Sequence, residues 1–361
     1  MHRGLIVVAI PAKDEAERIA ACLLALARQT FRPHDVLLLA NNCSDRTPGI
    51  ASAMAPALPY QLHVESCDLP TQHANAGHAR RLAMTRAERL VRPDGILITT
   101  DADAVAAPDW IERNGKAIAG GADLVCGRTV LSPSEAALIP AHLHADDALE
   151  CRLLELLDRI ADRLDPDPAD PLPRHSEAAG ASLAVTCAAF RRVGGIPAVP
   201  SGEDRAFVGA LARLDARIRH DPSVVVSVSG RTVGRAAGGM ADTIRRRMQQ
   251  QDEFADEQAE PAVDAYRRYD FRRRVRGAWR RQSLPHELAI DLGIAAQRLD
   301  RMLTERYFGS AWAGIEAASP FLTRRRVRFR ELPRQIDHAL HLLEHDNALD
   351  LVVDLGGKKA P

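Results

Sequence analysis

The chain has 361 residues, 46% of them hydrophobic, so it can bury a sizeable core and form one or two domains. Its 48 lysines and arginines balance 48 aspartates and glutamates, which argues against a global field that attracts nucleic acid or acidic lipid. No stretch reaches the roughly 18 apolar residues that a membrane-spanning helix needs. The six cysteines show no CxxC spacing, which favours a reducing cytosol. We therefore expect a soluble, cytoplasmic protein without a transmembrane segment.

The first part of the chain alternates strand and helix patterns. Residues 5–10 are a wholly apolar run, typical of a parallel strand covered on both faces, and Pro11 is expected to end it. Apolar residues spaced i, i+3, i+4 and i+7 then predict a helix over residues 15–29. Residues 36–40 repeat the strand pattern, and the polar turn over 41–47 leads into an alanine-rich helix. Two such units predict an α/β sheet.

An acidic motif follows a later strand of this predicted sheet. Strands are expected at residues 61–65 and 95–100, with a helix over 74–91 between them. The strand at 95–100 delivers Asp101 and Asp103 to its carboxyl end, where open α/β sheets bind ligands. Paired carboxylates suit a divalent cation, which a nucleoside diphosphate leaving group needs. A solvated turn gives the same pattern, so the preceding apolar strand supplies the context for the functional interpretation.

The second half of the chain is more helical. A strand is predicted at residues 124–125 and a long helix up to about Leu164. The proline-rich segment 165–173 cannot continue a helix and is expected to form a mobile flap. Residues 180–231 return to mixed helix and strand, and the pattern from about Ala241 onward is helical.

Four segments resemble, in order and spacing, the motifs of family 2 glycosyltransferases with the GT-A fold. They are residues 8–15 (VAIPAKDE), 41–47 (NNCSDRT), 75–77 (NAG) and 101–103 (DAD). The resemblance covers roughly residues 4–235. It implies a metal-dependent enzyme that takes a sugar from a UDP- or GDP-sugar and uses Mg²⁺ or Mn²⁺.

The resemblance and the helical pattern beyond about Ala241 together predict a domain organisation. A GT-A-like α/β catalytic domain, with a Rossmann-like nucleotide-binding sheet, is expected over residues 1–240. Its donor half spans about 1–130 and its acceptor half about 131–240. Residues 241–361 are expected to form a helical C-terminal extension.

Donor-binding residues follow from the matched motifs. The set that the motifs imply, in which Asp103 is the metal ligand, is Pro11, Ala12, Glu15, Asn41, Asp45, Gly77, Arg81, Asp101 and Asp103. Arg231 and Arg235 lie in a glycine-rich segment after an apolar strand and are expected to clamp the diphosphate or an anionic acceptor, unless they are exposed structural arginines. Glu15 is expected near the base or ribose, although Asp14 and Glu15 would also suit the cap of a helix. Asn41 stands where many relatives carry aspartate, which leaves the nucleotide base open. Gly77 would let the chain approach the diphosphate, and Arg80 or Arg81 would supply charge, unless this is a plain helix start with exposed arginines.

Acceptor and catalytic residues are implied farther along. Three residues match the strand that lines the acceptor cleft, namely Gly180, Ala181 and Ser182. The acidic pair Glu203 and Asp204 matches the catalytic position, with Asp204 as the base of an inverting reaction and Glu203 as its orienting neighbour. Two acids at a helix N-terminus would also be stabilising without any catalytic role. His175 and His220 are candidate third metal ligands, and neither has a diagnostic spacing.

The expected reaction is transfer of a single sugar to an acceptor hydroxyl, because a processive synthase would carry a membrane span and a QxxRW-like motif. Retaining transfer to a small, phosphoglycerate-like acceptor is an alternative, and Asp204 would then not be the base. A nucleotidyltransferase is a second alternative, but such enzymes usually have a basic, glycine-rich loop where residues 11–15 are acidic. A non-catalytic scaffold protein and a homo-oligomer are also left open.

Overall fold

The computed structural model describes residues 5–234, 239–283 and 285–345. The chain divides into two units. The sheet unit comprises Met1–Ile139, Glu177–Ala212 and Ala216–Gln249. The helical unit comprises Pro140–Ser176, Arg213–Asp215 and Gln250–Pro361. Residues 140–176, expected in the acceptor half, thus group with the C-terminal helices, while the domain boundary at residue 240 stays a prediction.

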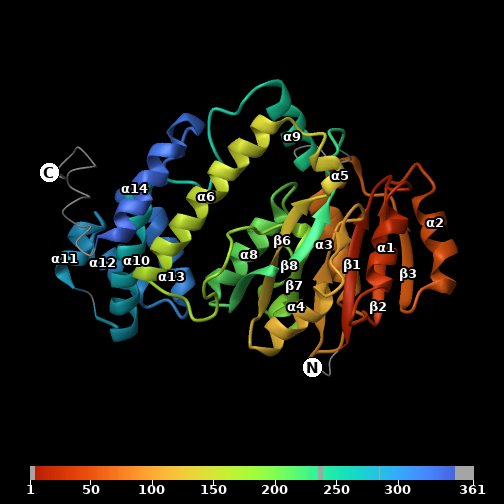
Figure 1. Cartoon of the computed structure of the whole chain (residues 1–361). Helices are drawn as coiled ribbons and strands as arrows, with labels where there is room; N and C mark the ends of the chain where they lie inside the picture. The colour runs from red at the N-terminus through yellow and green to blue at the C-terminus, as the bar shows by residue number, and fades with distance from the viewer. Residues whose placement is uncertain (1–4, 235–238, 284, 346–361) are drawn as a thin grey trace. The chain divides into compact units, whose positions relative to one another are not determined.

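The sheet unit is built on eight strands in the order β3-β2-β1-β4-β7-β6-β8-β5 (Figure 1). Their bounds are β1 Ile6–Ala12, β2 Asp35–Asn41, β3 Gln61–Cys67, β4 Ile96–Thr99, β5 Val105–Ala106, β6 Leu124–Leu131, β7 Leu183–Thr186 and β8 Ile218–Val228. Strands β3, β2, β1 and β4 run parallel to one another. Strand β7 runs antiparallel to β4 and β6, β8 is parallel to β6, and β5 is antiparallel to β8. This arrangement is the mixed α/β sheet that the strand and helix patterns predict.

Strand β1 is apolar throughout because both of its faces are covered. Val8 and Ile10 belong to one hydrophobic core together with Leu23 of helix α1 (Ile19–Ala27). Val7 belongs to a second core together with Met84 of helix α3 (Ala76–Ala87). Successive side chains of a strand point to opposite faces, so a run without polar residues is required here.

The remaining helices divide between the two units. Those of the sheet unit are α2 Thr47–Met54, α4 Trp110–Ala119, α5 Pro133–Ala136, α7 Cys187–Val193, α9 Met240–Gln249 and, up to Ala212, α8 Glu203–Arg213. Those of the helical unit are α6 Ala141–Leu164, α10 Ala262–Arg281, α11 His286–Asp291, α12 Ala296–Leu303, α13 Phe308–Ala318 and α14 Leu332–Glu344. In the part of the chain that the structure describes, no helix combines the length and the apolar character needed to cross a bilayer.

Two predicted boundaries in the first strand and helix are wrong. Strand β1 continues through Pro11 to Ala12, because β4 pairs with β1 only as far as Ala9 and the missing N–H of Pro11 interrupts no bond to that strand. Helix α1 begins at Ile19 rather than at residue 15. Asp14 has a φ of 53°, in the left-handed region, and cannot continue a right-handed helix.

The proline-rich segment after α6 is a loop, as predicted, and its ends are held within the helical unit. Asp165 is buried and accepts hydrogen bonds from Arg276 at 2.8 and 2.9 Å. At the other end, Arg174 donates to the carbonyl of Asp170 at 2.7 Å and to that of Asp158 at the same distance. Whether residues 165–173 between these anchors move on donor binding stays a prediction.

Candidate active site

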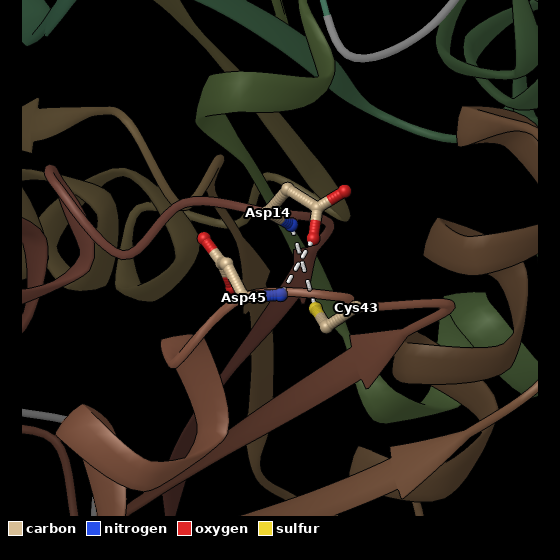
Figure 2. Close-up of side chains that lie close together, drawn as sticks. All are labelled: Asp14, Cys43 and Asp45. Atoms are coloured by element: carbon tan, nitrogen blue, oxygen red, sulfur yellow. Dashed lines mark hydrogen bonds between the residues drawn. The ribbon is translucent and has the colours of Figure 1, made fainter.

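The carboxyl ends of β1 and β2 carry two polar loops that are bonded to each other (Figure 2). Oδ1 of Asp14 accepts from the backbone nitrogens of Ser44 and Asp45, at 2.7 and 3.2 Å. Asp45 in turn accepts from the backbone nitrogen of Ala16 at 2.9 Å. Asp14 and Asp45 therefore join the two loops, and Asp14 does not cap helix α1.

The same two loops bring together potential metal ligands. In the described part of the chain, Asp14, Cys43 and Asp45 form a group whose ligating atoms lie within 4.8 Å of one another, and Asp103 is not in this group. The hydrogen bonds between the loops already occupy Oδ1 of Asp14. We therefore assign Asp14 a structural role, while contact of Asp45 with the donor stays a prediction.

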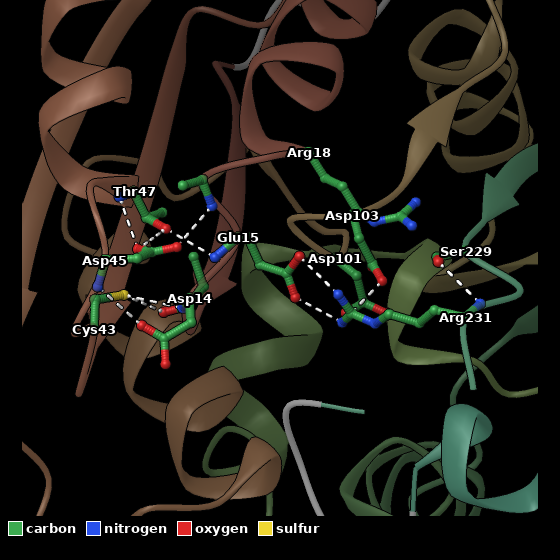
Figure 3. Close-up of polar contacts among 12 residues, drawn as sticks. Asp14, Glu15, Arg18, Cys43, Asp45, Thr47, Asp101, Asp103, Ser229 and Arg231 are labelled. Atoms are coloured by element: carbon green, nitrogen blue, oxygen red, sulfur yellow. Dashed lines mark hydrogen bonds and ion pairs between the residues drawn. The ribbon is translucent and has the colours of Figure 1, made fainter. Parts of the chain in front are cut away.

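Glu15, Arg231 and Asp103 form a second polar cluster (Figure 3). Arg231 donates from both terminal nitrogens to the two carboxylate oxygens of Glu15, at 2.6 and 2.8 Å. The same guanidinium lies 3.1 Å from Oδ2 of Asp103. Glu15 is buried, and its backbone nitrogen donates to Oγ1 of Thr47 at 2.8 Å. Three predicted donor residues thus meet at one place.

Asp103 carries an unusual charge environment. Burial raises the pKa of its carboxyl group from 3.8 to about 6, and the neighbouring Asp101 and Glu15 add to this effect, while Arg231 opposes it. Around the motif, four carboxylates (Glu15, Asp101, Asp103 and Glu203) face two guanidinium groups. Because hard cations prefer carboxylate oxygens, the excess negative charge at Asp101 and Asp103 fits a Mg²⁺ or Mn²⁺ ion.

Arg80 is the centre of a third, deeply buried cluster. It donates from Nη2 to Asp101 at 2.7 Å and from Nε to Glu203 at 2.9 Å. Its Nη1 donates to Oγ1 of Thr99 at 3.0 Å and to the carbonyl of Gly180 at 2.9 Å. Burial alone lowers the pKa of this arginine, but Asp101 and Glu203 raise it above its ordinary value. The cation therefore links the acidic motif after β4 to the start of α8.

Asp204 is held beside this cluster. Its Oδ2 accepts from the backbone nitrogen of Gly180 at 3.0 Å, and its Oδ1 from that of Arg205 at 2.8 Å. Glu203 is buried, whereas Asp204 is only partly buried. The structure thus separates the two predicted catalytic acids, since Glu203 is bound to Arg80 and Asp204 is the accessible one.

The predicted acceptor-lining residues Gly180, Ala181 and Ser182 are all buried. A Cβ atom at Gly180 would lie 2.5 Å from Cζ of Arg80, so the glycine makes room for the guanidinium. The hydroxyl of Ser182 accepts from Nε1 of Trp110 at 2.8 Å. These residues have a clear internal role, and their contact with an acceptor stays a prediction.

The other predicted donor residues are scattered. Pro11 and Ala12 end β1, and Asn41 is the buried last residue of β2. Gly77 packs against the backbone of residue 199, since a Cβ atom there would lie 2.2 Å from the carbonyl oxygen of Val199. Arg81 is exposed on α3. Arg235 lies outside the described residues.

The two candidate histidine ligands lie in different units. His175 belongs to the helical unit, whereas His220 is on β8 of the sheet unit. In the described part of the chain, neither joins Asp103 in a cluster of three ligating side chains. The role of either histidine as a third metal ligand stays a prediction.

Two connections escaped the sequence patterns. Arg80 falls on the buried face of α3 with Gly77, Met84 and Ala87, a spacing of i, i+3, i+7 and i+10 that would have distinguished it from Arg81. Glu135 accepts from Arg18 at 2.7 Å and from the backbone nitrogen of Gly230 at 2.9 Å. It thereby ties α5 to the segment that bears Arg231, and no local pattern signals this bond.

A family comparison identifies the class of enzyme. Residues 7–177 match the model of Glycosyl transferase family 2. Residues 7–177, somewhat less than half of the chain, belong to glycosyltransferase family 2. The matched span contains strands β1 to β6 and the acidic motif, so the predicted GT-A-like fold, with C-terminal helices beyond the family domain, is confirmed. The protein is therefore a glycosyltransferase that uses a nucleotide-sugar donor, as the sequence motifs predict. Glu203, Asp204 and Arg231 lie outside this span, so their roles are not carried by the match.

Solved structures with a similar chain path have low sequence identity. The mannosyltransferase PcManGT from Pyrobaculum calidifontis, in complex with GDP-Man and Mn²⁺, has a TM-score of 0.46 and 17% identity, covering 98% of this chain and 84% of its own. TarS 1-349 from S. aureus, in complex with UDP-GlcNAc, has a TM-score of 0.47 and 13% identity, covering 94% and 90%. Glucosyl-3-phosphoglycerate synthase from Mycobacterium tuberculosis, in complex with Mn²⁺, UDP-Glc and phosphoglyceric acid, has a TM-score of 0.41 and 15% identity, covering 69% and 80%. No curated protein matches the chain.

Proposed function

We propose that this family 2 enzyme transfers a single sugar from a UDP- or GDP-sugar to an acceptor hydroxyl with inversion at the anomeric carbon. The observation that carries the proposal is the position of Arg80, which binds Asp101 at 2.7 Å and Glu203 at 2.9 Å. This buried cation binds both the acidic motif and the N-terminus of α8, which carries Asp204, and so supports a shared site. The proposed donor-binding residue Asp101 and the candidate base Asp204 are thereby linked through Arg80 and Gly180.

On the donor side, Asp101 and Asp103 are the proposed ligands of a Mg²⁺ or Mn²⁺ ion. When bound, such an ion neutralises charge on the diphosphate and makes it a better leaving group. Arg231 is partly exposed and carries a fork of N–H donors that suits diphosphate oxygens. Glu15, which binds this guanidinium through both oxygens, would orient Arg231 toward the donor.

On the acceptor side, Asp204 is the proposed general base. The acceptor oxygen forms a bond to the anomeric carbon while the bond from that carbon to the diphosphate oxygen breaks, and the nucleoside diphosphate leaves with the electron pair. Asp204 takes the proton of the acceptor hydroxyl in this step. Glu203 is unsuited to the task because it is buried and its carboxylate accepts from Arg80.

The experiment first needs a donor. A thermal-shift screen of UDP- and GDP-sugars with and without Mn²⁺ should reveal one, because a ligand that binds only the folded state raises its stability. Hydrolysis of that donor, with water in place of the acceptor, then gives a rate without knowledge of the natural acceptor. Absence of cation-dependent hydrolysis across the whole panel would count against the proposal.

The base is tested by Asp204→Asn, which keeps the shape of the side chain but cannot take the proton. We expect kcat to fall by roughly 10²–10⁴-fold with little change in donor affinity. Glu203→Gln should lower kcat less than Asp204→Asn does, because Glu203 is not the proposed base. Asp242→Asn is a matched control, since Asp242 also lies in the first turn of a helix, α9, and its change should leave kcat unaltered. Near-native turnover of Asp204→Asn would show that this residue is not the base, and proton NMR of the transfer product would reveal retention if the reaction is not inverting.

A further inference from the structure

We infer that Arg80 is a positioning residue that sets the separation between the cation-binding carboxylate Asp101 and the base Asp204. The inference rests on the proposed function and extends it, because it assigns a role to a residue that the acceptor and donor do not need to touch. Arg80 is 7% exposed at its side chain, and each of its guanidinium nitrogens donates to another part of the sheet unit.

The hydrogen bonds of the planar Arg80 guanidinium connect three segments of the chain. Its three nitrogens reach Thr99 at the end of β4, Asp101 just after it, and Glu203 at the start of α8. A guanidinium is rigid and planar, so these partners cannot shift independently while all the bonds persist. The carboxylate of Asp101 and the first turn of α8 are therefore held at one separation.

Gly180 extends this restraint to the base itself. Its carbonyl accepts from Arg80 at 2.9 Å, and its backbone nitrogen donates to Oδ2 of Asp204 at 3.0 Å. A Cβ atom at residue 180 would lie within 2.5 Å of the guanidinium carbon, so only glycine permits this approach. Arg80 thus restrains Asp204 by two routes, through the backbone of Gly180 and through the adjacent residue Glu203.

Lysine cannot replace this arginine in the proposed role. An ammonium group keeps the positive charge between Asp101 and Glu203, but it is a point charge without a planar fork and cannot hold all four oxygens in the same geometry. Arg80→Lys therefore keeps the positive charge and removes the fixed geometry of the four hydrogen bonds. Arg86→Lys is the matched control, because Arg86 lies on the same helix and forms an ion pair with Glu65 at the opposite end of that helix.

The test measures cation-dependent hydrolysis of the UDP- or GDP-sugar found by the thermal-shift screen. Arg80→Lys should lower kcat by about 10²-fold, as a misplaced catalytic group commonly does, and change the donor KM by less than about threefold. Arg86→Lys should change neither. An unaltered kcat in Arg80→Lys would overturn the inference, and so would an effect confined to KM.

A double-mutant cycle with Asp204→Asn separates positioning from general damage to the fold. If Arg80 acts through the base, adding Arg80→Lys to the Asp204→Asn protein should lower kcat further by less than about threefold. A full loss in both backgrounds would mean that Arg80 supports the fold and not the base. If Asp204→Asn alone keeps its turnover, the proposed function has lost its base and the inference falls with it, whereas an inactive Asp204→Asn beside an active Arg80→Lys overturns the inference alone.

Gly180→Ala provides a second variant should Arg80→Lys not fold. The added methyl group would displace the guanidinium while both Arg80 and Asp204 are retained. We expect the same loss in kcat, with the same small effect on KM and the same non-additivity with Asp204→Asn. A folded Gly180→Ala protein with native kcat would contradict the positioning role.

Discussion

Arg231 donates to both carboxylate oxygens of Glu15, at 2.6 and 2.8 Å, although 216 residues separate them in the chain. The same guanidinium lies 3.1 Å from Asp103, the proposed cation ligand. An arginine and a divalent cation would both bind the oxygens of that carboxylate, so the two positive charges compete for it and repel each other. Arg231 therefore serves as an internal counter-charge for the acidic motif.

Removing this counter-charge should strengthen the binding of Mn²⁺ to the nucleotide-free protein. We expect Arg231→Gln to lower the Kd for Mn²⁺ by on the order of tenfold, because a positive charge about 3 Å from the ligand is lost. Isothermal titration calorimetry with MnCl₂ gives the Kd directly. Arg18→Gln is the control, since Arg18 pairs with Glu135 and not with Asp103. Weaker Mn²⁺ binding by Arg231→Gln would mean that Arg231 supports the cation site.

The raised pKa of Asp103 predicts a pH-dependent cost to stability. Because the pKa is 3.8 for the ordinary group and about 6 in the fold, the folded state favours the protonated form. The ionised form thus destabilises the fold, fully above about pH 6, and this cost disappears as the pH falls toward 3.8. The difference corresponds to roughly 3 kcal/mol at most.

Asp103→Asn should therefore stabilise the cation-free protein. We expect the free energy of unfolding to rise by roughly 1–3 kcal/mol at pH 8, and the gain to shrink as the pH is lowered through 6. Urea unfolding in EDTA at pH 8 and pH 5 measures both values. Asp94→Asn, at an exposed position, should give no such difference. A loss of stability at pH 8 would contradict the charge environment described for Asp103.

The same carboxylate should be required for binding of the donor. Asp103→Ala is expected to abolish the effect of Mn²⁺ on the affinity for UDP or GDP, because it removes the proposed ligand at the point where cation and diphosphate meet. Calorimetric titration of each nucleotide with and without Mn²⁺ tests this. Asp109→Ala, which removes a surface carboxylate that pairs with Arg113, should leave the effect intact. Cation-dependent affinity that survives Asp103→Ala would disprove the assignment.

Much of the donor half was predictable because its information is local. An apolar run bounded by polar turns indicates a buried strand, and the chain then places whatever follows at the carboxyl edge of the sheet. For this reason the positions of Glu15, Asp45 and Asp101 at strand ends agree with the sequence patterns.

The ion pairs could not be predicted, because a local pattern carries no information on distant partners. A hydrophobic period reports which face of an element is buried, and it does not report which distant side chain meets that face. The contact of Arg231 with Glu15 depends on the paths of several strands, so no spacing between the two encodes it. The burial of Arg80 was predictable, since the helical period separates it from Arg81. Its partners Asp101 and Glu203 became clear only in the fold.

Gly77, in the NAG motif of residues 75–77, has two possible explanations that can be distinguished by experiment. If Gly77 serves close approach of the diphosphate, Gly77→Ala should weaken donor binding and leave the empty protein unharmed. The structure favours a different reason, because the added Cβ atom would lie 2.2 Å from the carbonyl oxygen of Val199, and a backbone atom cannot move aside as a flexible side chain does. We therefore expect Gly77→Ala to lower the free energy of unfolding by about 1–3 kcal/mol without any donor, as overpacking commonly does. Gly49→Ala is the matched control, since Gly49 is also helical but has open space around the added atom, and it should be neutral or slightly stabilising. Urea unfolding of both variants decides the matter, and a fully stable Gly77→Ala protein with impaired donor affinity would favour the diphosphate explanation.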